Sequence, residues 1–208
     1  AKMLLGLSIE TLILLIPTLI FSLCVHEFAH GYIAYRLGDN TAARAGRLTL
    51  NPMAHLDPIG SLMLLIGGFG YAKPIPVNPM NFKNPREDMI KVALAGPVSN
   101  FILALIGCLL FRYIGAYGFI GDGLEFFIFI NIRLGVFNLI PVYPLDGGQI
   151  FSGLLDKTNP DLSYLLRRNG QKILFGIIAI AIFTPFDIIG LLSLPFNFMA
   201  TLIVRGGF

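Results

Sequence analysis

Charged side chains are scarce in this chain, because Asp, Glu, Lys and Arg make up only 13% of its 208 residues. Soluble domains carry about 25% charged residues, and here 55% of the residues are hydrophobic instead. This composition excludes an ordinary soluble domain and predicts an all-α polytopic membrane protein in a lipid bilayer. The net charge of +3 is too small to indicate a nucleic-acid partner.

Cysteine is also scarce, with only two in the chain, Cys24 and Cys108. Both lie inside apolar runs, which is typical of buried free thiols and does not support a disulfide framework. No small-residue cleavage site follows a short apolar region near the N-terminus, so we expect no removable signal peptide. The first apolar segment is therefore expected to be retained.

Long apolar runs are abundant, and a membrane span needs about 20 mostly apolar residues. We predict three spans, followed by two apolar stretches near the C-terminus, at 7–37, 89–113, 123–140, 173–183 and 188–204. The glycine-rich run 59–72 is short for a span, so we expect a re-entrant loop or hairpin there. Irregular backbone at membrane depth is tolerated only where protein or a water-filled cavity surrounds it.

Basic residues cluster after the first predicted span, before the second and after the third. Cytoplasmic loops carry an excess of Lys and Arg, so this pattern predicts that these loops face the cytoplasm. Because the sequence "HEFAH" at 26–30 closes the first span, it is expected to lie toward the cytoplasmic side of the membrane.

Histidine is rare as well, yet two of the three histidines, His26 and His30, are four residues apart with Glu27 between them. On a helix, residues at this spacing share one face, about 5–6 Å apart at Cβ. They can converge on one zinc ion, and Glu27 can reach a metal-bound water, as in the H-E-x-x-H motif of zinc hydrolases. The alternative, two histidines bonded to helix neighbours, is disfavoured because ionisable groups inside a span are costly.

A catalytic zinc site usually has three protein ligands, and the extended motif with a third histidine is absent, since Ile33 and Arg36 occupy those places. Asp146 differs from the other candidates because Pro144 and a glycine pair bracket it, where irregular backbone can hold a carboxylate. The residues alone leave the choice open among His55, Asp57, Glu87, Asp122, Glu125, Asp146, Asp156, Asp161 and Asp187.

Four segments together resemble the site-2 protease family of intramembrane zinc metalloproteases: "HEFAH", "GGFGYAKPIPVNP", "ALAGPVSN" and "FNLIPVYPLDGG". The resemblance implies a single domain over 1–208, with a three-helix catalytic core at about 7–150. It also implies a small membrane-embedded β-loop and two further C-terminal transmembrane segments at about 171–205. The chain is similar to the compact branch of the family, which lacks PDZ and CBS domains.

The resemblance also implies residue roles. Asp146 would be the third ligand of one Zn²⁺ per chain, beside His26 and His30, with Glu27 as the catalytic residue. Asn138 would position substrate, although a helix–helix hydrogen bond is the alternative for this side chain. The β-loop edge at Gly70, Tyr71 and Ala72 would bind an extended substrate segment. Close helix packing is expected at Gly96 and Pro97, and Asn100 is a weaker candidate for the site.

The function that follows is hydrolysis of a peptide bond within or next to a transmembrane segment of a substrate protein, in a prokaryotic cell membrane. A catalytically inactive protein that binds transmembrane partners is one alternative, which the intact Glu27 disfavours. A metal transporter is another, which is disfavoured because the polar groups collect at one depth. We expect His55 to anchor its loop, with a second metal site as the alternative.

Overall fold

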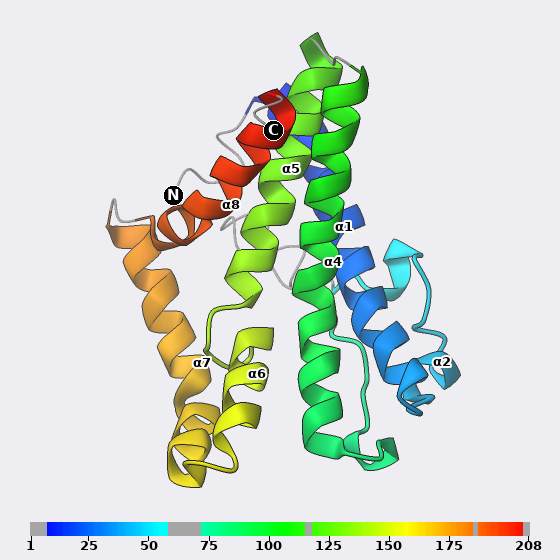
Figure 1. The fold of residues 1–208 in the computed structure, drawn as a ribbon, viewed down its shortest axis with the longest axis vertical. Helices are drawn as coiled ribbons and strands as arrows, with labels where there is room; N and C mark the ends of the chain where they lie inside the picture. The colour runs from blue at the N-terminus through cyan, green and yellow to red at the C-terminus, as the bar shows by residue number, and fades with distance from the viewer. Residues whose placement is uncertain (1–7, 58–71, 115–117, 185–186, 206–208) are drawn as a thin grey trace.

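The structure is a computed structural model that describes residues 8–57, 72–114, 118–184 and 187–205. These ranges are mostly helical and contain no strand. Figure 1 shows the helices standing largely side by side. The helices in chain order are α1 (Ile9–Arg36), α2 (Thr41–Arg44), η2 (Pro52–Ala54), η3 (Pro79–Asn81), α4 (Pro85–Ile114), α5 (Gly118–Asn138), α6 (Asp146–Leu155), α7 (Pro160–Phe183) and α8 (Ile188–Arg205).

Local capping fixes where the long helices begin. The Ser8 side chain accepts a hydrogen bond from the Thr11 N–H at the start of α1. Asn159 caps α7 in the same way through the Leu162 N–H, and Pro160 follows it at the first helical position. Short polar side chains at this position satisfy N–H groups that have no partner in the helix, and proline has no such group to lose.

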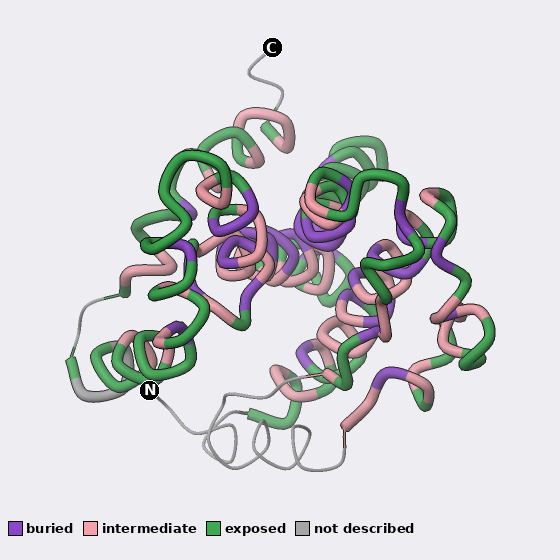
Figure 2. Tube along the Cα trace, turned by 90° about the horizontal axis from the view of Figure 1, so that it is seen from below, coloured by how far each residue is buried: buried purple, intermediate pink, exposed green. Residues whose placement is uncertain are grey.

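Helix α4 lies at the centre of the fold, packed against α1, α5, α6 and α8. The largest buried apolar cluster joins α4 to α5 through Ala104, Cys108, Ile128, Ile132 and Val136, and side chains of α8 pack onto it. In Figure 2 the buried parts of the chain gather where the helices meet, and the outward turns are exposed. The two cysteines are buried and free, as expected.

Three helices of the described part of the chain, α1, α4 and α8, are long and apolar enough to cross a membrane. Many large apolar side chains on their outer faces are exposed, such as Ile102 (52%) and Leu194 (57%). A soluble protein rarely exposes so much apolar surface, whereas a bilayer covers it. Helix α5 carries Asp122, Glu125 and Arg133, and the first half of α7 is polar, so neither is among these three.

The segment after the third predicted span differs from our expectation. Residues 141–172 lie between the apolar stretches predicted at 123–140 and 173–183 and were expected to form a loop, but the structure forms α6 there and begins α7 at Pro160. Gly147 and Gly148 lie in the first turn of α6, and Pro160 is the first residue of α7, where proline has no N–H to lose. Pro141 and Pro144 precede α6. Helix α6 packs against both α4 and α7.

Most of the predicted re-entrant segment, including Gly70 and Tyr71, lies outside the described residues. The described part begins at Ala72, which forms an isolated antiparallel bridge with Leu56. The next residue, Lys73, donates its N–H to the His55 carbonyl at 2.8 Å. The chain is therefore extended and paired along one edge at this point.

Candidate metal centre

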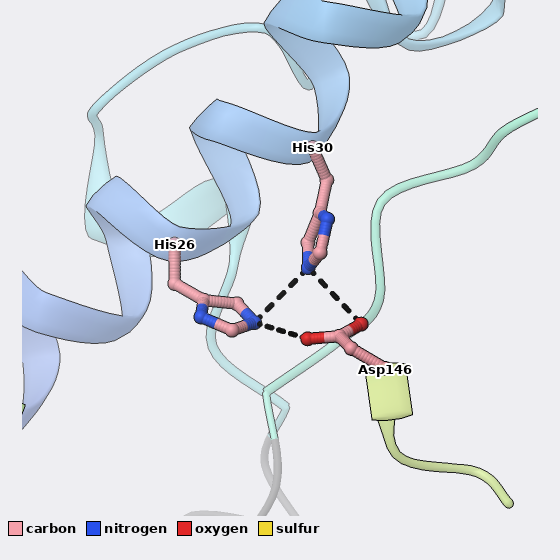
Figure 3. Close-up of side chains that lie close together, drawn as sticks. All are labelled: His26, His30 and Asp146. Atoms are coloured by element: carbon pink, nitrogen blue, oxygen red, sulfur yellow. Dashed lines mark hydrogen bonds and ion pairs between the residues drawn. The ribbon is translucent and has the colours of Figure 1, made fainter. Parts of the chain in front are cut away.

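Two helices bring three potential ligands together (Figure 3). His26 and His30 lie one turn apart on α1, and their Nε2 atoms are 3.0 Å from each other. Asp146 is the first residue of α6, and its two carboxylate oxygens lie 3.1 Å from His26 Nε2 and 3.3 Å from His30 Nε2. These three side chains are the one group in the described residues that could hold a metal ion.

The outer nitrogens of both imidazoles are engaged elsewhere. His30 Nδ1 lies 2.7 Å from the Val92 carbonyl, and His26 Nδ1 lies 2.7 Å from Asn100 Oδ1. Because a carbonyl oxygen only accepts, Nδ1 must carry the proton in each ring, and a neutral ring then has a lone pair on Nε2. Both Nε2 lone pairs face the Asp146 carboxylate.

A metal ion fits this donor set. Two imidazole nitrogens and one carboxylate are a ligand set of catalytic zinc sites. Metal–ligand distances of roughly 2.0–2.2 Å would separate the atoms of a tetrahedral site by about 3.4 Å, close to the observed 3.0–3.3 Å. Asp146 Oδ2 is buried without a hydrogen-bond donor, although His26 Nε2 is nearby. If His26 is neutral, its Nε2 lone pair faces a lone pair of the Asp146 carboxylate, and the two repel each other. A cation bound between them would attract both.

Glycines allow Asp146 and the histidines to approach so closely. A Cβ at Gly147 would lie 2.2 Å from the Leu139 carbonyl oxygen, and one at Gly148 would lie 2.4 Å from the Tyr143 nitrogen. Any side chain at either position would push α6 away from the preceding loop. On the other side of the centre, a Cβ at Gly96 would lie 2.4 Å from His30 Nε2. The chain therefore needs glycine on both sides of the imidazole pair.

Glu27 lies beside the metal group and is held by the extended segment. Its Oε2 accepts a hydrogen bond from the Ile75 N–H at 2.9 Å. No second hydrogen bond to this carboxylate is found in the described part of the chain. Glu27, both histidines and Asp146 all line a cavity of about 530 Å³, so the carboxylate is fixed in direction and open to the same space.

The structure places two of the other predicted site residues on this cavity. Asn138 and Ala72 line it, and Asn138 Nδ2 also donates to the Leu134 carbonyl at 3.0 Å. This bond lies within α5, so it is not the helix–helix bond that we considered as the alternative. Gly70 and Tyr71 lie outside the described residues.

The remaining candidates for a third ligand lie outside the metal group. Among them, Glu87, Asp156 and Asp187 pair with Lys157, Arg167 and Arg133. His55 is buried, and its Nε2 lies 2.6 Å from the Thr49 carbonyl. This contact fits the expected role of His55 as a loop anchor.

Sequence reasoning underrated one neighbour of the metal group and missed another. Asn100, which we treated as a weak candidate, contacts His26 directly, and Asn131 of α5 accepts a hydrogen bond from Asn100 at 3.1 Å. The available signal was a polar side chain within the apolar run "FIFINIRLGVF". Polar residues within a predicted span deserve a functional hypothesis.

Comparisons with known proteins identify zinc metalloproteases as relatives of this chain. The profile of Peptidase family M50 matches residues 115–184. "Putative zinc metalloprotease YwhC" of Bacillus subtilis (strain 168) is 49% identical over 150 residues, which are 68% of this chain and 68% of that protein. "Putative zinc metalloprotease Rip2" of Mycolicibacterium smegmatis is 32% identical over 180 residues, covering 83% of this chain and 68% of that protein.

One solved structure, "Site-2 Protease from Methanocaldococcus jannaschii", is 24% identical, with a TM-score of 0.44. The similarity covers 92% of this chain and 78% of that one. The curated relatives define the class as zinc metalloproteases. The chain belongs to Peptidase family M50, the site-2 protease family, and zinc is its metal.

Proposed function

We propose that this protein is an intramembrane endopeptidase that cuts a peptide bond within or next to a transmembrane segment of another membrane protein. His26, His30 and Asp146 are the zinc ligands, and Glu27 is the catalytic residue. The observation that carries the proposal is the convergence of two Nε2 lone pairs and one carboxylate on a single point, beside Glu27, in a cavity between apolar helices.

Zinc bound there would polarise a peptide carbonyl and make water a stronger acid. Glu27 then acts as the general base that removes a proton from the attacking water, and it delivers a proton to the leaving amine. The Ile75 N–H holds Glu27 Oε2, which leaves the other carboxylate oxygen for proton transfer. Proton transfer by a positioned carboxylate contributes about 10²–10⁴ to a rate.

The extended segment at Ala72 is the proposed docking edge for the substrate. Lys73 points its N–H toward His55, and successive residues of an extended chain point their backbone groups to opposite edges. The N–H and C=O of Ala72 therefore face away from the bridge with Leu56, and Ala72 lines the cavity. A substrate unwound into an extended form could pair with these groups, as in β-strand addition.

Two further parts of the proposal concern substrate position and membrane orientation. Asn138 lines the cavity with its side chain anchored to Leu134, which supports a role in orienting the substrate backbone. The basic loops support an orientation with the metal centre toward the cytoplasm. Because the matched relatives come from prokaryotes, we place the protein in a prokaryotic cell membrane, as a multi-pass protein.

The test is to compare zinc content and peptide-bond cleavage in purified protein. Candidate membrane-protein substrates would be incubated in detergent or liposomes with wild type, Glu27→Gln and Asp146→Asn. We expect Glu27→Gln to keep its zinc and lose cleavage by about 10²–10⁴, and Asp146→Asn to lose both. Glu125→Gln, an exposed carboxylate on α5, is the matched control and should cleave normally. Equal cleavage by wild type and Glu27→Gln would refute the proposal.

A further inference from the structure

Two buried asparagines connect His26 to the backbone of α5. Asn100 of α4 and Asn131 of α5 are both 0% exposed. His26 Nδ1 lies 2.7 Å from Asn100 Oδ1, and Asn100 Nδ2 donates to Asn131 Oδ1 at 3.1 Å. Asn131 Nδ2 then donates to the Phe127 carbonyl at 2.9 Å. The hydrogen bonds form an unbroken relay across α1, α4 and α5.

The far end of the relay fixes the direction of every bond in it. The Phe127 carbonyl can only accept, so the amide nitrogen of Asn131 must face it and the amide oxygen must face Asn100. Asn100 consequently presents its own nitrogen to Asn131 and its oxygen to His26. That oxygen requires a proton on His26 Nδ1, which leaves the Nε2 lone pair directed at Asp146.

His30 reaches the same tautomer by a shorter route, since its Nδ1 contacts the Val92 carbonyl directly. A backbone carbonyl cannot be removed by substitution, whereas the support of His26 consists of side chains. The relay is therefore the part of this support that mutation can change. An imidazole with its proton on Nε2 could not bind a metal through that atom.

We propose that Asn100 and Asn131 are positioning residues for the metal centre, which hold His26 with its proton on Nδ1 and its Nε2 free to bind zinc. This inference rests on the proposed zinc site. The competing explanation is that the two asparagines only join helices, as polar residues often do in membranes. The two explanations differ in what the hydrogen-bond acceptor at each position does for zinc affinity.

The experiment compares leucine and aspartate at position 131, which are close to asparagine in size. Zinc affinity is measured in detergent by competition with a chelator, without any substrate. Asn131→Leu removes the acceptor that orients Asn100, so we expect zinc affinity to fall by roughly 10- to 100-fold, as for other residues that orient a ligand. Asn131→Asp keeps an oxygen for Asn100 Nδ2, so its affinity should stay within a few-fold of wild type.

This pair of variants separates the two explanations because they predict opposite orders of zinc affinity. A buried aspartate is worse for folding than a buried leucine, so a purely structural role would make Asn131→Asp the weaker binder. We expect Asn131→Asp to bind zinc more tightly than Asn131→Leu, even though it unfolds at a lower temperature. Equal affinities, or weaker binding by Asn131→Asp, would overturn the proposal.

A second pair keeps the test decisive if either variant at 131 fails to fold. Asn100→Leu removes the acceptor for His26 Nδ1, and Asn100→Asp retains it, so the same order of zinc affinities is expected. Ser193→Ala removes a buried hydroxyl that bonds within α8, away from the relay, and should leave zinc affinity unchanged.

The outcome is independent of whether the enzyme cuts a membrane substrate. A wild type that binds no zinc would remove the proposed metal site itself. A wild type that binds zinc but cleaves nothing would remove the proposed activity and leave the relay intact. Wild-type zinc affinity in both Asn100→Leu and Asn131→Leu would refute the proposed role of the relay and leave the proposed metal site unaffected.

Discussion

Gly96 of α4 lies against the metal-facing nitrogen of His30, so closely that a Cβ at position 96 would lie 2.4 Å from it. The same Cβ would lie 2.5 Å from His26 Nε2. Real Cβ atoms do not approach other atoms at such distances, so any side chain there must displace at least one imidazole. The absence of a side chain on α4 is therefore part of how the fold brings the proposed zinc ligands together.

Gly96→Ala should weaken zinc binding by roughly tenfold or more, because ligand orientation controls metal affinity. The matched control is Gly176→Ala on α7, where a Cβ would meet no atom within 4 Å. Alanine normally favours a helix over glycine by about 1 kcal/mol, so the control should be neutral or slightly more stable. Chelator competition measures both variants, and wild-type affinity in Gly96→Ala would contradict this packing argument.

Removing zinc should destabilise the folded protein, because the site binds the metal only when α1 and α6 are in place. Zinc at about 100 times its dissociation constant stabilises the folded state by about 2.7 kcal/mol, and at about 1,000 times by about 4.1 kcal/mol. Thermal unfolding in detergent, with chelator and with added zinc, measures this increment. His26→Ala should abolish the increment, whereas His55→Ala, which lies outside the metal group, should keep it.

Proline at position 72 should reduce cleavage without changing zinc content. Ala72→Pro removes the N–H that the proposed docking edge offers to a substrate. One backbone hydrogen bond contributes about 0.5–1.5 kcal/mol, which corresponds to a loss of roughly 2- to 10-fold in kcat/KM. Ala72→Ser keeps the N–H and is the control. Unchanged cleavage by Ala72→Pro would exclude pairing at this residue.

Asp39 should make folding stability depend on pH in the acid range. It is 0% exposed and accepts hydrogen bonds from Thr41, Asn81 and the Asn78 N–H. Burial raises the pKa of Asp39, but the hydrogen bonds together lower it by more than burial raises it. The net pKa therefore lies below its ordinary value of 3.8. A lowered folded-state pKa gives a stabilisation that is complete above 3.8 and is lost as the pH falls through the folded pKa.

Asp39→Asn should therefore be less stable near neutral pH, by about 1–3 kcal/mol, because one buried donor loses its acceptor. Its stability should also fall less than that of wild type as the medium is acidified. Thermal unfolding near neutral pH and in acid measures both effects. Parallel loss of stability in the two proteins would show that Asp39 does not contribute to the pH dependence.

The paired histidines and Glu27 could be predicted from sequence because a single helix determines their geometry. The period of the α-helix places His26 and His30 on one face wherever the helix packs. Asp146 could not be chosen by spacing, since its position depends on the path of the connection between α5 and α6. The resemblance to a family selected it from the acidic candidates, and the structure places it between the two imidazoles.

The relay through Asn100 and Asn131 could not be predicted because it depends on the rotation of α1, α4 and α5 relative to one another. Helix α6 was missed for a different reason. Its glycine pair suggested a loop, yet Gly147 and Gly148 are required by contacts with the backbone at Leu139 and Tyr143. Glycine is typical of loops, but here it is required because α6 packs closely against the segment that precedes it.

The hydrogen bond from the Ile75 N–H to Glu27 joins the proposed general base to the segment against which a substrate is proposed to lie. Movement of that segment must therefore move the carboxylate as well. A polypeptide that enters the cavity without aligning along this segment would push the segment away from Glu27. The Glu27 carboxylate would then no longer be oriented to accept a proton. Under the proposed function, this coupling would prevent cleavage of membrane proteins that do not align with the segment. No pocket that recognises individual side chains would be needed for this selectivity.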